Sequence, residues 1–456
     1  MGRIVYAEEC LLNYLEKLKN PNDYTIGLIL GQSTEQKDYV VHLARTPPPA
    51  SKDVIEESNE QHQQNSPAVK RIKTLGDVPS SWVADHAKHV TRMLPGGMWV
   101  LGIFIAGPVD CLNENNSMQK LKSITSAIHK NLSVNPYLYG NNPNESIILA
   151  FNNSNKKFSC KSFGDNASMK NADWKFQLNI TKWYQLETRV DFDQLFPIEN
   201  NKKIESLKKQ HENILDDIYK KINSAIIAIE DSPKSPDELV QLTGNKKKKF
   251  LKQTKNDESN LNDVSLQAAI YIPCSSNSQY EIKQINCNGQ IRLIGQLVSR
   301  TFVHELSRVE EATNAIKQDI MRSLASRLEM HWDSLLEEEN SLPEDNVTLH
   351  EPPRRVLVAL PHSKITLSDY LFPGEGHQEA LISLQELLDL KVEESSVQKE
   401  FELQVDPSEF YCQNELSSKP SEHAKYQDNS MYIVYGTGLG IAISLLILAI
   451  IIQYFY

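Results

Sequence analysis

Apolar and polar residues alternate over several short stretches in the first part of the chain, and this pattern predicts strands. The predicted strands cover residues 24–30, 38–45, 98–106, 146–152, 157–163 and 175–190. The run 98–106 is almost wholly apolar and too short to cross a bilayer, so we expect a strand buried on both faces. The first residues of the chain predict a further strand, followed by a short amphipathic helix.

Two helices are predicted between these strands. Ser80-Ser81 caps the first, which stops at Pro95-Gly96-Gly97, and the second covers about residues 116–132. Residues 46–75 hold three consecutive prolines and few large apolar residues, so they predict a mobile surface loop. Because strands and helices alternate, residues 1–190 predict a layered α/β domain.

Helical spacing of apolar residues returns in residues 203–230 and again in a long stretch, 303–339. Strands are predicted at residues 266–273, 280–287, 290–302 and 355–360, with Asn288-Gly289 as a type I′ hairpin turn. A helix near 378–390 closes a second α/β domain, residues 191–392. Within it, residues 244–262 predict a linker with four lysines at 246–249, which contact anionic lipid, act as a localisation signal or simply lie in a solvated loop.

The end of the chain has a different pattern. From Tyr432 to Ile452 no residue is charged, and about 20 apolar residues in a helix match a hydrocarbon core of about 30 Å. Tyrosines flank this run on both sides, where their amphipathic rings prefer the level of the headgroups. We therefore predict a single C-terminal transmembrane helix at residues 431–452, preceded by a polar tether at 393–430.

The first residues argue for the side of the membrane on which the bulk of the chain lies. Glu8, Glu9 and Glu16 interrupt what would be the apolar core of a secretory signal. Insertion after synthesis would leave residues 1–430 in the cytosol, and six scattered cysteines without a CxxC pair agree with a reducing compartment. The formal net charge of −11 argues against a general nucleic-acid binder, because phosphate contact needs a basic face.

Motifs that carry chemistry are scarce in the sequence: it holds no HExxH, P-loop, Rossmann glycine fingerprint or GxSxG elbow. His86 and His89 lie three apart on one predicted helix, but no third ligand stands at an obvious spacing for a metal. Cys10 and Cys111 would be nucleophiles only beside a base in space. We predict no catalytic residue, metal or cofactor, and keep a divergent hydrolase that uses these residues as the alternative.

The order of strands, loop, helix, LPGG turn and apolar strand resembles the MPN fold, the scaffold of zinc-dependent JAMM deubiquitinases. In catalytic members the strand that matches Trp99 to Ile105 ends in a His-x-His-Pro zinc signature. Here that end reads Ile103-Phe104-Ile105-Ala106-Gly107-Pro108, and hydrocarbon cannot donate a lone pair to zinc. The resemblance therefore implies a catalytically silent MPN-like domain that serves as a binding platform.

Several strings are similar to one family in more detail. They are GQSTEQKDYVVHLARTPPP (31–49), DHAKHVTRMLPGG (85–97), VLGIF (100–104), ADWK (172–175), RRVLVALP (354–361) and DYLF (369–372). Together with the terminal anchor, they resemble the odr-four family, tail-anchored proteins named for defective odorant response. The resemblance implies an endoplasmic-reticulum membrane protein that helps odorant and other G-protein-coupled receptors fold and traffic. It also implies a partnership with the cysteine protease specific for the ubiquitin-fold modifier.

These strings also supply candidate contact residues. We predict partner contact for Asp38, Tyr39, Arg45, Arg92, Leu94 and Trp174. A guanidinium on the edge of an element suits carboxylate recognition, whereas Trp174 also fits a core position, and Pro95, Gly96 and Gly97 fit turn geometry. In the terminal span, Gly436 and Gly440 form a GxxxG, which allows close packing against a receptor helix.

Overall fold

A computed structural model of the chain describes residues 2–18, 23–34, 37–47, 72–140, 145–164, 169–178, 181–199, 207–241, 265–273, 287–339, 352–361, 363–398 and 402. These residues belong to one compact unit, Met1–Leu403. The predictions for residues 48–71, 244–262 and 403–452, which include the membrane span with Gly436 and Gly440, fall outside the described residues. Within the described part of the chain, no helix is both long and apolar enough to cross a membrane.

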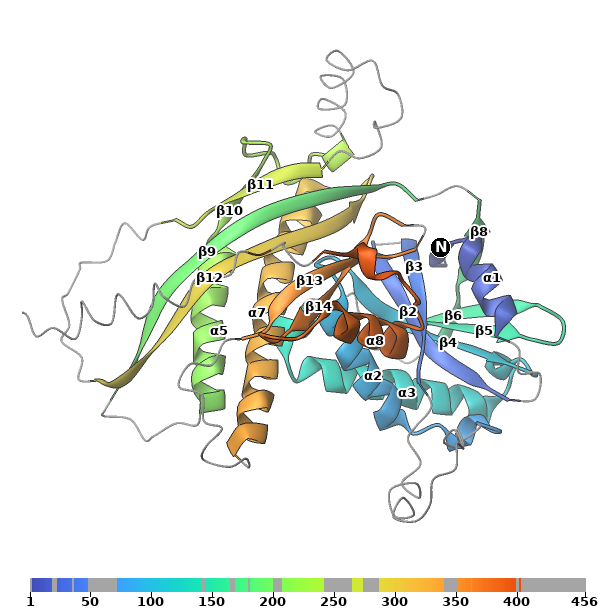
Figure 1. The fold of residues 1–456 in the computed structure, drawn as a ribbon. Coiled ribbons are helices and arrows are strands. Elements are labelled where there is room, and N and C mark those ends of the chain that lie inside the picture. The colour runs from blue at the N-terminus through green and yellow to red at the C-terminus, as the bar shows by residue number, and fades with distance from the viewer. Residues whose placement is uncertain are drawn as a thin grey trace, which may run out of the picture. The chain divides into compact units, whose positions relative to one another are not determined.

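An eight-stranded mixed sheet forms the first part of the fold, in the order β7-β6-β5-β4-β2-β3-β1-β8 (Figure 1). Its strands are β1 (Ile4–Glu8), β2 (Thr25–Ser33), β3 (Lys37–Arg45), β4 (Trp99–Gly107), β5 (Glu145–Asn152), β6 (Phe158–Gly164), β7 (Met169–Asn171) and β8 (Asp173–Gln177). The two edge strands, β7 and β8, are separated in sequence by Ala172 alone, and the Ala172 N–H donates to the Cys160 carbonyl at 3.1 Å. The two ends of the sheet therefore come together at this residue.

Helices cover both faces of this sheet. Helix α2 (Ser80–Met93) and helix α3 (Asn115–Ser133) pack on one face, and helix α1 (Glu9–Lys17) packs on the other. Strand β4 sends Ile103 and Ile105 to the first face and Phe104 to the second, and all three are buried. The prediction that 98–106 is a strand buried on both faces is therefore confirmed.

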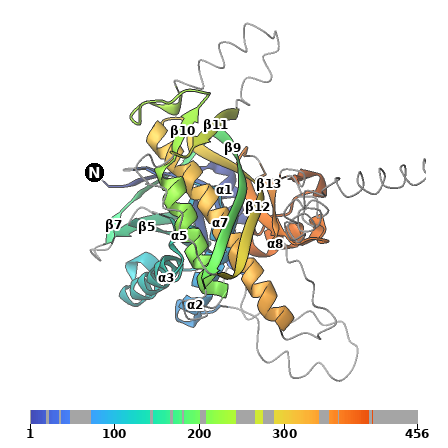
Figure 2. The same cartoon turned by 90° about the vertical axis from the view of Figure 1, so that its left-hand side faces the viewer.

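A second sheet has the order β10-β11-β9-β12. Its strands are β9 (Trp183–Glu199), β10 (Ile226–Ile229), β11 (Ser265–Tyr271) and β12 (Cys287–His304). Strands β9 and β12 form a long antiparallel ladder from Trp183 opposite His304 to Glu199 opposite Cys287. Helix α5 (Leu207–Ser224) and the long helix α7 (Val309–Glu339) lie side by side against this sheet, as both views show (Figures 1 and 2).

The last described elements return to the first sheet. Strands β13 (Arg354–Ala359), β14 (Thr366–Leu371) and β15 (Val397–Gln398) form a small antiparallel sheet. Helix α8 (His377–Leu388) lies between β14 and β15 in the chain. Val356, Leu384 and Leu388 belong to the same apolar cluster as Leu28 and Ile103 of the first sheet. The observed class is mixed α/β, and segments at both ends of the described chain share one core.

The structure corrects several predicted boundaries. The single strand predicted at 175–190 is two strands, β8 and β9, which lie in different sheets. Helix α5 ends at Ser224, and residues 226–229 form β10. Apolar residues occupy every position of 225–229, so this run is compatible with either a helix or a strand. Pairing with β11 makes it a strand.

Two further corrections concern β12 and its surroundings. Asn288 and Gly289 lie within β12 rather than in a hairpin turn, because this strand pairs with β9 instead. The long helix begins at Val309 and not at 303, because Val303 and His304 continue the ladder with β9. Helix α2 does begin at Ser80, but its N-cap is Pro79 and no side chain caps it.

Candidate functional site

The LPGG turn, which follows α2, is held against α7 by its backbone. The Gly96 N–H donates to Asp319 Oδ1 at 2.8 Å, and the Gly97 N–H donates to Gln318 Oε1 at 2.9 Å. A Cβ on Gly96 would lie 1.9 Å from the Ala315 carbonyl oxygen, and Gly97 has a φ of +80°. One glycine is required by close contact with the helix and the other by a left-handed backbone.

A fully buried arginine lies where the LPGG turn contacts α7. The Arg322 guanidinium donates to the carbonyl oxygens of Leu94, Pro95, Met98, Leu138 and Tyr139. These carbonyls belong to the LPGG turn, to Met98 directly after it and to the short helix α4 (Pro136–Tyr139), so one side chain ties the turn and α4 to α7. Burial lowers the pKa of Arg322 to about 10, which still leaves it cationic at neutral pH.

A buried ion pair links the same helix to β13. Arg355 donates through both terminal nitrogens to the Asp319 carboxylate, at 2.7 and 2.9 Å, and its Nε donates to Ser368 Oγ at 2.8 Å. Asp319 therefore serves Gly96 and Arg355 at once. This double engagement satisfies the hydrogen bonds that offset the loss of hydration of the buried charges.

Gln32 joins the two large sheets. Its Nε2 donates to the carbonyls of Gly97 and Phe302 at 3.2 and 3.3 Å, and its Oε1 accepts from the His304 N–H at 2.8 Å. The strings that contain Gln32 and the LPGG turn thus meet α7 and β12 at one place, which we call the α7 junction: Gln32, Leu94 to Gly97, Asp319, Arg322 and Arg355.

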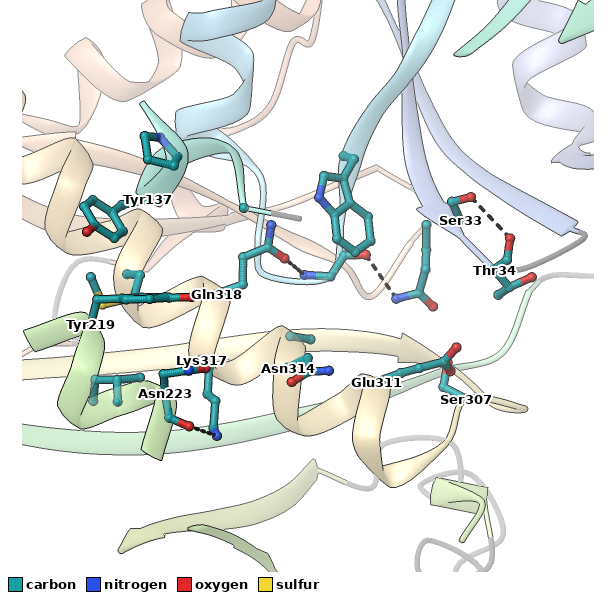
Figure 3. A pocket seen from close by; sticks show the side chains of 18 residues that line it. Ser33, Thr34, Tyr137, Tyr219, Asn223, Ser307, Glu311, Asn314, Lys317 and Gln318 are labelled. Atoms are coloured by element: carbon teal, nitrogen blue, oxygen red, sulfur yellow. Dashed lines mark hydrogen bonds between the residues drawn. The ribbon is translucent and has the colours of Figure 1, made fainter. Parts of the chain in front are cut away.

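A cavity of about 510 Å³ lies beside the α7 junction (Figure 3). Its wall comes from the end of β2, the start of β4, α4, α5 and α7. The lining residues are Gln32, Ser33, Thr34, Gly97, Trp99, Pro136, Tyr137, Gly140, Tyr219, Ile222, Asn223, Ser307, Glu311, Asn314, Ala315, Lys317, Gln318 and Met321. This volume is in the usual range of ligand pockets, about 300–1,000 Å³.

The side chains around the cavity are suited to binding. Tyr137 and Tyr219 form an aromatic pair with ring centroids 5.3 Å apart, and Lys317 Nζ donates to the Asn223 carbonyl at 2.7 Å (Figure 3). Carboxamides and hydroxyls make up most of the remaining polar wall. The described wall contains neither cysteine nor histidine, so it offers hydrogen bonds, one carboxylate and one ammonium rather than a nucleophile and base pair.

The predicted contact residues Asp38 and Tyr39 point inward. Asp38 is fully buried, forms an ion pair with Arg3 and accepts from Ser33 Oγ at 2.6 Å. The Tyr39 ring stacks on His304, with centroids 3.8 Å apart. Burial lowers the pKa of His304 to about 4, so its ring is neutral in this stack at physiological pH.

The four other predicted contact residues differ in exposure. Leu94 and Trp174 are buried, at 1% and 5% exposure. Arg92 pairs with Glu329 at 2.8 Å, and its side chain is 13% exposed. Arg45 pairs with Asp389 at 3.2 Å, yet its side chain remains 46% exposed, the largest of the six. Partner contact by these residues stays a prediction.

His86, considered as a metal ligand, is engaged by hydrogen bonds within the protein. His86 is buried and holds both ring nitrogens to protein atoms, Nδ1 to Thr46 Oγ1 at 3.1 Å and Nε2 to the Leu387 carbonyl at 2.7 Å. Burial lowers its pKa to about 4. Its engagement leaves no lone pair for a metal, and the described residues hold no group of three or more metal-ligating side chains.

The cysteines considered as nucleophiles carry protonated thiols at neutral pH. Cys10 is an exposed residue, but desolvation of its thiol group and the negative charge of Glu8 raise its pKa. Cys111 is buried, its thiol donates to the Val109 carbonyl at 3.5 Å, and burial raises its pKa. A nucleophilic cysteine needs the opposite shift, since the thiolate is the reactive form.

Sequence reasoning missed the charged residues of α7. Asp319 and Arg322 lie between the apolar positions Ile316, Ile320 and Leu324, which define the buried face of this helix. Their position directly beside the apolar face could have indicated that these two charged residues are buried. Lys317 and the cavity had no such signal, because their surroundings come from five separate segments.

Comparison with known proteins adds the family. The "Protein odr-4 homolog" of Mus musculus is 27% identical over 468 residues, covering 100% of this chain and 99% of its own length. The "Odorant response abnormal protein 4" of Caenorhabditis elegans is 23% identical over 359 residues, covering 75% and 69%. A crystal structure of UfSP from C. elegans aligns with a TM-score of 0.40 and 8% identity, over 86% of this chain and 57% of that chain. The family model described as ODR4-like, odorant response abnormal 4-like, matches residues 27–399, and the chain therefore belongs to the ODR4-like family.

Proposed function

We propose that this chain is a non-catalytic adaptor of the endoplasmic-reticulum membrane that supports the folding and trafficking of odorant and other G-protein-coupled receptors. The match of the family model to residues 27–399 carries this proposal, together with relatives named for odorant response. The geometry is consistent with a scaffold, because the buried polar groups of the α7 junction all serve to brace one element against another.

The adaptor acts, in this proposal, by recruiting the cysteine protease specific for the ubiquitin-fold modifier. The resemblance of the strings at 31–49 and 85–97 to the odr-four family supports this partner. Arg45 is the best contact candidate among the predicted residues, since its guanidinium is the most exposed of them.

The membrane anchor determines where the adaptor and its bound protease act. Residues 431–452 are proposed to span the membrane and to leave residues 1–430 in the cytosol. A protease held by this tail meets membrane-bound substrates at a raised effective concentration, without any new contact to them. Gly436 and Gly440 are proposed to pack against receptor helices.

The proposal is tested with three versions of the chain in cells: full length, a truncation after residue 430, and full length with residues 431–452 replaced by an unrelated apolar span. The truncation is expected to retain the protease in affinity capture but to release both proteins from membranes. The replaced span is expected to restore membrane location. Loss of protease capture in the truncation, or retention of the truncation on membranes, would contradict the adaptor model.

A double substitution, Gly436→Ile with Gly440→Ile, separates anchoring from helix pairing. If the span packs against receptor helices, receptor export falls while the chain itself stays on the membrane. Unchanged receptor export would leave anchoring as the only role of the span.

A further inference from the structure

We propose that the cavity beside the α7 junction is a binding site for a carboxylate at the end of a short peptide-like chain, with Lys317 as its counter-charge. This site goes beyond the adaptor role and does not depend on it. Two features of the cavity carry the inference: a half-buried cation and a carboxylate farther along the same helix.

Lys317 is the cation. It projects from α7 into the wall of the cavity and is half-buried. Its ammonium donates one hydrogen bond, to the Asn223 carbonyl, which leaves two N–H groups for a ligand. Within the described residues, no carboxylate lies within ion-pair distance of Lys317, and burial lowers its pKa. A half-buried cation is destabilised by the loss of hydration, and an anion in the cavity would offset that loss.

A carboxylate matches this part of the wall, because its two oxygens can accept the two N–H groups that the Lys317 ammonium has left. Trp99 lines the same cavity with its ring, whereas its Nε1–H is shielded from the cavity.

The opposite charge farther along α7 limits the ligand. Glu311, Asn314 and Lys317 follow one another at intervals of three residues, and Figure 3 shows Asn314 between the other two. Six residues of α-helix separate Glu311 from Lys317 by about 9 Å along the axis. The Glu311 carboxylate repels a second negative charge on the ligand and favours an amino group or a neutral group at the end of the ligand that lies beside it. The length suits about two or three residues of extended peptide.

The remaining wall accepts the body of such a ligand. Tyr137 and Tyr219 provide aromatic area, and the carboxamide of Asn314 provides both donors and an acceptor for a peptide group. The carboxylate could come from a free short peptide or from the C-terminal end of a polypeptide. These two sources share the same chemistry at Lys317.

Calorimetric titration of the full-length chain in detergent micelles tests the site with three probes: acetyl-Ala-Ala-Ala with a free carboxylate, the same peptide with a C-terminal amide, and unblocked Ala-Ala-Ala. We expect the free carboxylate to bind at least about tenfold more tightly than the amide, as for loss of a charge-assisted hydrogen bond. The unblocked peptide is expected to bind as well as the acetylated one or better. Equal affinity for acid and amide, or no heat from any probe at millimolar concentration, would overturn the proposal.

Variants assign the effect to the cavity. Lys317→Met keeps the aliphatic stem and is expected to weaken the acid probe by at least about tenfold, whereas Lys317→Arg keeps the charge and most of the affinity. Lys220→Met removes an exposed lysine of α5, which pairs with Asp217 outside the cavity, and serves as the matched control. Unfolding curves of each variant verify that it is folded, and equal binding by Lys317→Met would refute the assignment.

The two sources of carboxylate are separated by placing Ala-Ala-Ala at the C-terminus of a folded carrier protein on a flexible linker. Binding of this carrier with an affinity like that of the acetylated peptide identifies polypeptide ends as ligands. Binding of the free peptides alone identifies a small-molecule site. Capture of the protease by the Lys317→Met variant is measured in parallel, so that a failure of this site is distinguished from a failure of the adaptor model.

Discussion

The α7 junction and the cavity beside it lie on the same helix but differ in how their polar groups are satisfied. In the junction, Asp319, Arg322 and Arg355 are almost fully buried, and all are held by hydrogen bonds to protein atoms. In the cavity wall, Lys317 has no counter-charge within the described residues and donates one hydrogen bond, to the Asn223 carbonyl. The comparison separates polar groups that hold the fold together from polar groups that are available to a ligand.

The largest effect is expected from Arg322→Met. This change removes a buried cation that donates to five backbone carbonyls, of which the Pro95 and Tyr139 oxygens each keep one other donor. The loss of these hydrogen bonds should lower the free energy of unfolding by about 3–5 kcal/mol. Urea denaturation measures it. Arg308→Met, at an exposed ion pair with Asp237, is the control and should change stability by less than about 0.5 kcal/mol. A small effect of Arg322→Met would remove the distinction between junction and cavity.

Gly96→Ala tests the close contact between the turn and the helix. The new Cβ would lie 1.9 Å from the Ala315 carbonyl oxygen, so backbone must move, and we expect a loss of about 2–3 kcal/mol. Gly376→Ala is the matched control, because its nearest neighbour is 4.0 Å away. Equal thermal unfolding of the two variants would show that the turn is not held tightly against α7.

The histidine that joins α2 to α8 predicts a pH dependence. The folded pKa of His86, about 4, lies below its unfolded value of about 6.5, so the unfolded chain binds more protons between these values. This contribution to stability is present above about pH 6.5 and is lost as the pH falls towards 4. Between pH 7 and 5 we expect His86 to account for about 1–2 kcal/mol of the loss, measured as the difference between wild type and His86→Gln in urea titrations at both pH values. Parallel pH profiles for the two proteins would contradict this role.

The smallest effect on stability is expected from Lys317→Met. The cation it removes is half-buried, has no counter-charge within the described residues, and donates one bond to the Asn223 carbonyl. The lost bond and the relieved desolvation oppose each other, so we expect a change within about 1 kcal/mol in either direction. The contrast with Arg322→Met, five residues along the same helix, is the sharpest test of the comparison. A loss as large as that of Arg322→Met would place Lys317 with the residues that hold the fold.

Much of the fold was predictable from local pattern. Strands β2, β3 and β4 and helices α2, α3 and α8 lie where alternation and helical spacing predicted them. Two misplaced boundaries share one cause: at residues 226–229 and 303–304 the pattern is compatible with two structures, and pairing with a distant strand selects between them. For the site, the strings at 31–49 and 85–97 contain Gln32 and the LPGG turn, but the sequence pattern did not predict that they meet each other and α7.

The sequence by itself determined the position of most helices and strands, because backbone geometry imposes its period on neighbouring residues, and it indicated the family through contiguous strings. Only the tertiary structure decided the use of individual polar residues. Asp319 and Lys317 are two positions apart in one helix, yet one is neutralised by Arg355 from a later strand and the other faces a cavity built from five segments. The energy of a charge depends on its surroundings in space, and those surroundings are assembled by contacts between residues far apart in the chain.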